Sequence, residues 1–491
     1  MNRFKVLLYS LTGVISVILI LYGLNIYPTP GTDSRVFIPA ALFYSRGLGL
    51  INPLYDVSVL GMVTDVQNSV KFNYYVPFFP MLLGSLSKIH PGVKAIFFIC
   101  SSFSIASLFL YCRTIASVLP DRLSRLMKAL VLCSIVYVVT YLIPTVGRPE
   151  TITVLLVFMV FLLYNKKAGL NTVLYNVLIC IIFSVMFATQ VICFYFCFLF
   201  FVTFELINTA NVFKTILLNT TRFAIIGLLF YVILSASPHG FTDTINTVRE
   251  HASAAMTRKD RTIKLFIHYW LFAPLNFGFL VLFLLCAFFY VKLLFARLKN
   301  NSVVVVVLVC AIQFMVLYGI ARFILYASPT VYNATQFILP LSVFMLLNIA
   351  ALPKGLLKNL ASALTITVYA GGILIFLRVF ILFIDYKNDR KDYAAARPII
   401  NGFVHNNKHI FITVNLWPLV DDLNDIRFYD GIHIQKGDTL VVQQMYLPFA
   451  NEILSKCTIL YDWRTEERRK FLGIPLTNTP QGYSFTVCRV N

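Results

Sequence analysis

The run VLLYSLTGVISVILILYGLNI at residues 6–26, followed by YPTPGTDSR at 27–35, sets how the rest of the chain is interpreted. About 20 consecutive apolar residues are enough to cross the hydrocarbon core of a bilayer. Asp33, in the second stretch, is the first acidic residue of the chain. A carboxylate just past the end of a span can deprotonate an acceptor hydroxyl. The alternative is that Asp33 caps a helix that begins near Ser34.

The composition indicates a membrane protein. The chain has 491 residues, of which 59% are hydrophobic and 13% charged, with a mean hydropathy of +0.79. Soluble domains are about 45–50% apolar and about 25% charged. Apolar runs recur along most of the length, so we predict an α-helical polytopic membrane protein with about eleven transmembrane helices. The runs are continuous and do not alternate, which excludes a β-barrel.

The first apolar run could also be part of a signal peptide, because Arg3 and Lys5 precede it. However, the run is longer than a typical signal-peptide core, and no small-x-small cleavage motif follows it. We therefore expect a retained first span with its N-terminus in the cytoplasm.

The distribution of lysine and arginine predicts the topology. The net charge is +20, and clusters of these residues fall in most of the predicted cytoplasmic loops. This pattern favours a topology signal and contact with anionic lipid over a nucleic-acid partner. The C-terminus is then expected outside, and the spans themselves are nearly free of charge. The predicted spans are 6–26, 94–117, 129–146, 151–164, 171–188, 190–208, 221–236, 271–293, 302–321, 333–352 and 361–384.

Three segments between or after the spans have their own character. The first outside segment, 27–93, contains amphipathic stretches at 36–44 and 74–86 that are typical of helices at the membrane interface. The outside loop 237–270 carries several cations against the positive-inside bias, which indicates phosphate binding unless the predicted topology is wrong there by one span. From about residue 386, charge rises and short β-type runs appear.

We therefore divide the chain into a transmembrane region, 1–385, and a small extracytoplasmic α/β domain, 386–491. Strands are expected at 409–414, 439–443, 458–461 and 483–487. Eight cysteines lie in or at the ends of predicted spans and resemble small core residues. The other two, Cys457 and Cys488, fall in the C-terminal domain and are candidates for a disulfide in an oxidising compartment.

Several short motifs resemble the GT-C superfamily of polytopic glycosyltransferases. They are the acid after the first span, Ala41-Leu-Phe-Tyr44 with Pro53-Leu-Tyr55 beyond it, Tyr74-Tyr75-Val-Pro77 before the second span, and Arg148-Pro149-Glu150 at the end of the third. An outward last span followed by an extracytoplasmic domain is also similar to that family's layout. The resemblance covers the whole architecture.

The resemblance implies an inverting transferase that uses a polyprenyl-phosphate-linked sugar. Asp33 would be the base toward the acceptor hydroxyl, and Glu150 would be a second acid or would orient Arg148. The lipid phosphate leaving group needs cations. The residues expected to bind donor or lipid phosphate are Arg35, Lys71, Tyr74, Tyr75, Arg148, Arg249, His251, Arg258, Arg261, Arg322 and Gln336.

One stretch departs from the family pattern. Gln336 stands where related enzymes often carry a cation, and Arg322 and Tyr326 are the residues that could compensate. In the cationic loop, neither His239 nor His251 has partners at metal-ligand spacing. The sequence implies no certain cofactor and leaves the assistance of a divalent metal open.

The length and the long first and last outside segments are most similar to serotype-converting O-antigen glucosyltransferases of enteric bacteria and their phages. That resemblance implies transfer of glucose from undecaprenyl phosphate to an O-antigen (lipopolysaccharide) acceptor on the periplasmic side of the inner membrane. A flippase and a donor synthase would act upstream. A transporter or flippase of lipid-linked sugars is the main alternative, and a polymerase or ligase is another. Nearly charge-free spans and the absence of a visible repeat favour the enzyme.

Overall fold

The computed structural model describes the chain in segments, and these fall into two compact units. The described residues are 3–25, 34–50, 76–118, 147–237, 240–246, 249, 287–288, 290–291, 294–320, 391–406, 410–413, 416, 419–421, 426–428, 434–443, 454–465, 470–471, 474–475 and 484–491. The first unit comprises Met1–Leu19, Val76–Phe79 and Cys100–Ile375. The second comprises Ile20–Tyr75, Pro80–Ile99 and Phe376–Asn491.

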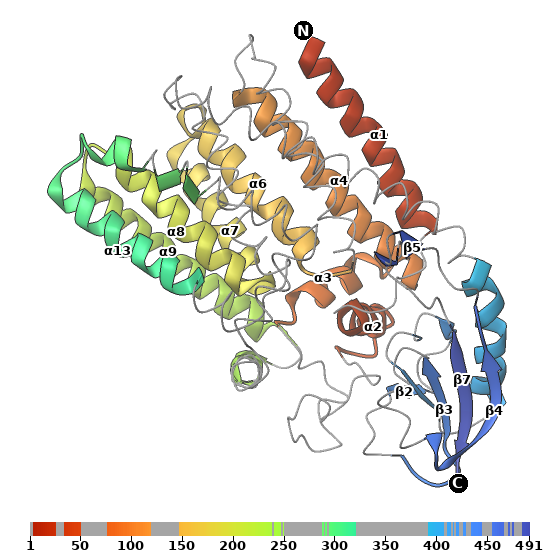
Figure 1. Ribbon diagram of the computed structural model, residues 1–491. Coiled ribbons are helices and arrows are strands. Elements are labelled where there is room, and N and C mark those ends of the chain that lie inside the picture. Colours follow the sequence, from red (N-terminus) through yellow and green to blue (C-terminus); the bar gives the residue numbers. More distant parts are fainter. Residues whose placement is uncertain are drawn as a thin grey trace. The chain divides into compact units, whose positions relative to one another are not determined.

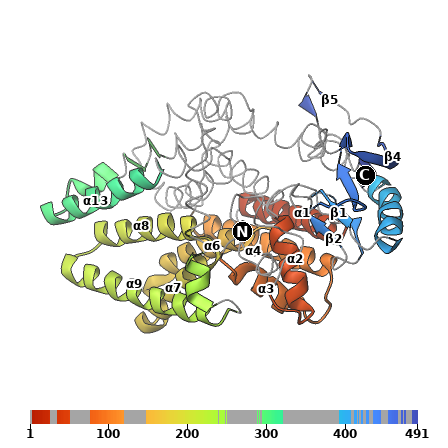
Figure 2. The same cartoon turned by 90° about the horizontal axis from the view of Figure 1, so that it is seen from below.

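Long helices make up most of the first unit. They are α1 (Arg3–Asn25), α4 (Val93–Val118), α6 (Glu150–Lys166), α7 (Thr172–Thr189), α8 (Val191–Ile207), α9 (Val212–Ser235) and α13 (Val303–Ile320), with a 3₁₀ turn, η2 (Lys167–Gly169), between α6 and α7. Residues 20–25 of α1 and 93–99 of α4 belong to the second unit. Among the described residues, five helices are long and apolar enough to cross a membrane, and α8 is a shorter apolar helix. Figures 1 and 2 show α7 beside α6, α8 and α9, with α13 against α8.

Helices α4 and α6 run in the same direction. The Cys100 thiol hydrogen-bonds with the backbone of Gly147. Further along both helices, the Ser107 hydroxyl donates to the Thr151 carbonyl at 3.5 Å, and the rings of Tyr111 and Phe158 lie 5.0 Å apart. Later residues of α4 contact later residues of α6, so the two helices are parallel. This is expected if both helices cross the membrane from the same side.

Aromatic side chains fill the space between α7, α8 and α9. Phe183 makes edge contacts with the rings of Phe194, Phe198 and Phe201, and Phe187 stacks on Phe230 at 4.0 Å. Hydroxyl groups in the same helices are satisfied within their own helix by bonds to carbonyls four residues earlier, as Ser184 does to Cys180. Such bonds allow polar residues to be buried among apolar ones.

The structure corrects one predicted span. The span expected at 221–236 begins at Val212, so Lys214 lies in the first turn of α9 and not in a preceding loop. Asn211 caps the helix by accepting from the backbone N–H of Lys214 at 3.0 Å. The polar residues around Arg222 interrupt the apolar run, but Asn219 and Arg222 are hydrogen-bonded to neighbouring helices, and the helix continues through them.

Some of the other predicted spans are confirmed, and the rest are untested. Helices occupy the spans expected at 6–26, 94–117, 151–164, 171–188, 190–208 and 302–321. Those at 129–146, 333–352 and 361–384, and all but a few positions of 271–293, lie outside the described residues. The total of about eleven therefore stays a prediction.

Two short helices of the second unit coincide with the predicted interfacial stretches. They are α2 (Ser34–Ser45) and α3 (Phe78–Leu86). The two helices approach so closely at Gly84 that a Cβ atom there would lie 2.6 Å from the Ala41 carbonyl oxygen and 2.8 Å from the Tyr44 ring. A backbone oxygen cannot move aside cheaply, so this contact requires glycine.

Gly84→Ala is expected to destabilise the protein by about 1–3 kcal/mol, the usual cost of overpacking. The measurement is the thermal unfolding of the purified protein in detergent. Gly92→Ala is the matched control, because nothing lies within 4 Å of a Cβ at Gly92. Equal midpoints for the two variants would contradict the close contact of α2 and α3.

A five-stranded sheet lies near the C-terminus, in the order β2-β1-β3-β7-β4. The strands are β1 (Ile410–Ile412), β2 (Ile426–Phe428), β3 (Thr439–Gln443), β4 (Cys457–Trp463) and β7 (Phe485–Val490). β1 is parallel to β2 and β3, whereas β7 is antiparallel to β3 and β4. A two-stranded ribbon of β5 (Lys470–Phe471) and β6 (Ile474–Pro475) completes the described strands.

All four predicted strands are confirmed, while β2, β5 and β6 were not predicted. A helix over 391–406 packs on the sheet, with the Phe403 ring 6.2 Å from that of Tyr461 in β4 (Figure 1). Asn401 fixes this helix to the loop that follows β1, since its side chain donates to the Leu419 carbonyl and accepts from the Asp421 N–H.

Candidate functional site

The pair Arg148–Glu150 lies at the start of α6. The Arg148 guanidinium donates to both oxygens of the Glu150 carboxylate, from Nε at 3.1 Å and from Nη2 at 2.9 Å. The Glu150 side chain is 2% exposed and that of Arg148 is 12% exposed. This two-point contact is the strongest geometry available to an arginine and a carboxylate.

The local backbone explains why the pair forms. Gly147 has a φ of 81°, a left-handed conformation that favours glycine. Pro149 precedes the first helical residue, and the Thr151 hydroxyl donates to the Arg148 carbonyl at 2.7 Å. Glu150 therefore occupies the first turn, where the positive end of the helix dipole stabilises a carboxylate.

A third polar residue reaches the pair from the junction of α7 and α8. Gln190 is 5% exposed and takes a non-helical conformation, with φ −152° and ψ 94°, that separates the two helices. Its side-chain amide donates to Glu150 Oε1 at 3.5 Å. The Glu150 carboxylate is thus held by two side chains, so it can orient Arg148. Its burial and pairing fit that role better than the role of a second acid.

The remaining predicted site residues are only partly described. Arg35 lies in the first turn of α2, and Arg249 is helical and exposed. Asp33 directly precedes the first residue of α2 but lies outside the described residues, so its capping and catalytic roles both stay predictions. Also outside the described residues are Lys71, Tyr74, Tyr75, His251, Arg258, Arg261, Arg322 and Gln336.

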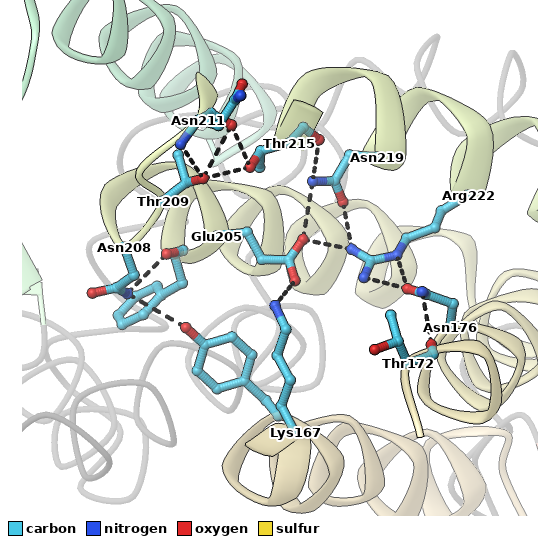
Figure 3. A network of polar contacts seen from close by, with 12 residues as sticks. Lys167, Thr172, Asn176, Glu205, Asn208, Thr209, Asn211, Thr215, Asn219 and Arg222 are labelled. Carbon is cyan, nitrogen blue, oxygen red and sulfur yellow. Dashed lines mark hydrogen bonds and ion pairs between the residues drawn. The ribbon is translucent and has the colours of Figure 1, made fainter. Parts of the chain in front are cut away.

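The structure contains a second buried polar cluster that we did not predict from the sequence, and we call it the Glu205 network (Figure 3). Arg222 of α9 donates to Glu205 of α8 at 2.5 Å, and Lys167 of η2 donates to the other oxygen of Glu205 at 2.9 Å. Asn219 donates to Glu205, and Asn176 accepts from the Arg222 guanidinium. Figure 3 shows these side chains converging from three helices and the turn after α6.

The two clusters lie near opposite ends of α6. Glu150 is its first residue and Lys167 follows its last. Because a helix rises ~1.5 Å per residue, the ends are about 25 Å apart. Exposed cations gather at the Lys167 end. They are Lys166, Lys214, Arg297 and Lys299.

The C-terminal cysteines are close together. Cys488 lies opposite Ile459 and Cys457 opposite Val490, so the two cysteines are diagonal neighbours on adjacent strands. Both are free thiols, and they hydrogen-bond with each other. Burial raises the pKa of the Cys488 thiol, and the neighbouring Cys457 adds to this effect. Cys488 is therefore protonated at neutral pH, and Cys457 is the more exposed of the two thiols.

Oxidised glutathione is expected to join Cys457 to Cys488, with the two thiols losing two protons and two electrons to the reagent. Closing a loop of about 30 residues would stabilise the C-terminal domain by roughly 4 kcal/mol. Peptide mass spectrometry should detect the linked peptides and their loss on reduction. Recovery of both cysteines as separate glutathione adducts, with no linked peptide, would contradict the pairing.

Within the described segments, no group of three or more His, Cys, Asp or Glu side chains is placed to hold a metal ion. Comparisons of the chain with protein-family models, with curated proteins and with solved structures gave no match. The function is therefore argued from the site itself.

Proposed function

We propose that the protein is a polytopic, inverting glycosyltransferase of GT-C type. It moves a hexose, in our view glucose, from undecaprenyl phosphate to an O-antigen acceptor outside the cytoplasmic membrane. The observation that carries the proposal is Arg148, an arginine held in place by the buried Glu150 at one end of an apolar helix. An arginine fixed in this way is suited to binding the phosphate of a lipid-linked donor.

The charge distribution supports the orientation. The Lys167 end of the helices carries most of the described exposed cations of this bundle, as cytoplasmic ends do. The Arg148 end would then face the periplasm. Asp33 follows the first span and would reach the same side of the membrane, provided that α1 crosses it outward.

The proposed reaction needs two contributions from the protein. Asp33 takes the proton of the acceptor hydroxyl while that oxygen bonds to the anomeric carbon from the face opposite the phosphate. The bond from the anomeric carbon to the phosphate oxygen breaks, and the configuration inverts. Arg148 stabilises the charge that develops on the leaving lipid phosphate, and Glu150 acts as a positioning residue for Arg148.

A transporter of lipid-linked sugars is the second candidate, because one observation favours it. Arg222 and Glu205 are a buried ion pair inside apolar helices, and ionisable residues there often mark a transport pathway. Against this reading, both side chains are almost fully buried and paired with each other. Mass spectrometry of surface polysaccharide, with and without the gene, separates the two: a transferase adds one hexose per repeat unit, whereas a transporter without transferase activity adds none.

Arg148→Lys is expected to lower kcat/KM for the lipid donor by roughly 10- to 100-fold, or about 1.4–2.8 kcal/mol. Lysine keeps the charge but cannot make the two-point contact with Glu150 or with phosphate. The measurement is transfer by the purified protein from polyprenyl-phosphate glucose. Arg113→Lys is the control, because Arg113 is exposed near the other end of α4. An unchanged KM and kcat would remove Arg148 from the phosphate role.

A further inference from the structure

The Glu205 network contains more positive than negative charge. Glu205 is one carboxylate, and it is paired with two cations, Arg222 and Lys167. Arg222 is 2% exposed and Glu205 is 3% exposed, so these two neutralise each other inside the protein. The excess charge therefore lies on Lys167, whose side chain is 51% exposed. A cation at the edge of an apolar region favours a counter-anion.

Lys167 is held in place, unlike an ordinary surface lysine. Its ammonium is fixed by Glu205 at 2.9 Å and lies 5.5 Å from the centre of the Tyr175 ring. Among the described residues, Glu205 is the one carboxylate within ion-pair distance of it. The buried Tyr175 hydroxyl has no hydrogen-bond partner in the described part of the chain.

The surroundings indicate that the anion belongs to a lipid. Lys167 directly follows α6, so its ammonium would lie at headgroup level if α6 spans the bilayer. The first two turns of α7, which begins five residues after Lys167, carry exposed apolar side chains: Val173 is 71%, Leu174 49% and Val177 48% exposed. Acyl chains can cover such a face, whereas a free phosphate ion cannot.

We propose that Lys167 binds the phosphate of an anionic phospholipid, with the acyl chains against the exposed face of α7. Glu205 is the positioning residue that fixes the lysine, and Arg222 binds the other oxygen of Glu205. This site lies at the opposite end of α6 from Arg148, and it is tested without any measurement of sugar transfer.

The test is native mass spectrometry of the full chain in detergent with added phosphatidylglycerol, phosphatidylcholine or inorganic phosphate. We expect phosphatidylglycerol to be retained about tenfold more strongly than phosphatidylcholine. Lys167→Met should remove most of this preference. Lys214→Met is the matched control, since Lys214 is exposed at the same end of the bundle without an ion-pair partner among the described residues, and it should retain the lipid as the wild type does.

Three results would overturn the proposal. They are equal retention of the two lipids, equal loss in the Lys167→Met and Lys214→Met variants, and displacement of the lipid by millimolar inorganic phosphate. Lys167→Arg tests whether the loss of lipid in Lys167→Met reflects misfolding, because arginine can keep both the bond to Glu205 and the contact with phosphate. Loss of lipid preference in that variant, with an unchanged unfolding temperature, would also count against the site.

Discussion

Asp33→Asn is expected to abolish sugar transfer, lowering kcat by at least about 10³-fold. General-base catalysis by a positioned carboxylate typically contributes 10²–10⁴-fold, and asparagine cannot accept the proton of the acceptor hydroxyl. The substitution preserves size and hydrogen bonding, so an N-cap role for Asp33 would be kept almost intact. The measurement is transfer by the purified variant, together with its expression and its thermal unfolding.

The control is Asp56→Asn, another acid in the first outside segment. If Asp33 only caps α2, its variant should lose at most about 1 kcal/mol of stability and keep its activity. If Asp33 is the base, activity disappears while stability stays unchanged. Equal activity of the Asp33 and Asp56 variants, near that of the wild type, would refute the catalytic assignment.

The sequence was sufficient to predict where most described helices lie, because a membrane span is determined by its own apolar run. The 171–188 prediction matches α7 to within a residue, since Asn171 caps the start and Gln190 ends the run. The sheet was predicted less completely. Strands β3 and β7 have strong β-type composition, whereas β2 is a three-residue strand paired with β1.

The candidate site could be predicted only in part. Arg148 and Glu150 are two residues apart beside a glycine and a proline, so their pairing is local and visible in the sequence. The Glu205 network is different, because Arg222 and Glu205 are 17 residues apart and belong to different helices. A hydropathy profile counts each polar residue in a span as unfavourable. The partner that compensates for the burial of that residue is known only once the packing of the helices is known.

Glu205→Leu is expected to destabilise the first unit by roughly 3–5 kcal/mol, the largest loss of stability that we predict. Removing one partner of a buried ion pair leaves an unpaired buried charge. Here the variant would leave Arg222 with no carboxylate among the described residues and Lys167 with none either. Arg222→Leu should cost less, because Glu205 would still be neutralised by Lys167 at 2.9 Å.

The double variant Glu205→Leu/Arg222→Leu decides whether the pair acts as a unit. Replacing both members of a buried pair by apolar residues is often neutral or stabilising, so the double variant should be more stable than Glu205→Leu alone. The measurement is thermal unfolding in detergent, read as a double-mutant cycle, with the exposed Thr220→Leu of the same helix as control. Additive losses would mean that the ion pair does not couple α8 to α9. In the double variant Lys167 no longer has the Glu205 carboxylate as its ion-pair partner. A double variant that is stable but binds no phosphatidylglycerol would show that the network positions Lys167 for its ligand.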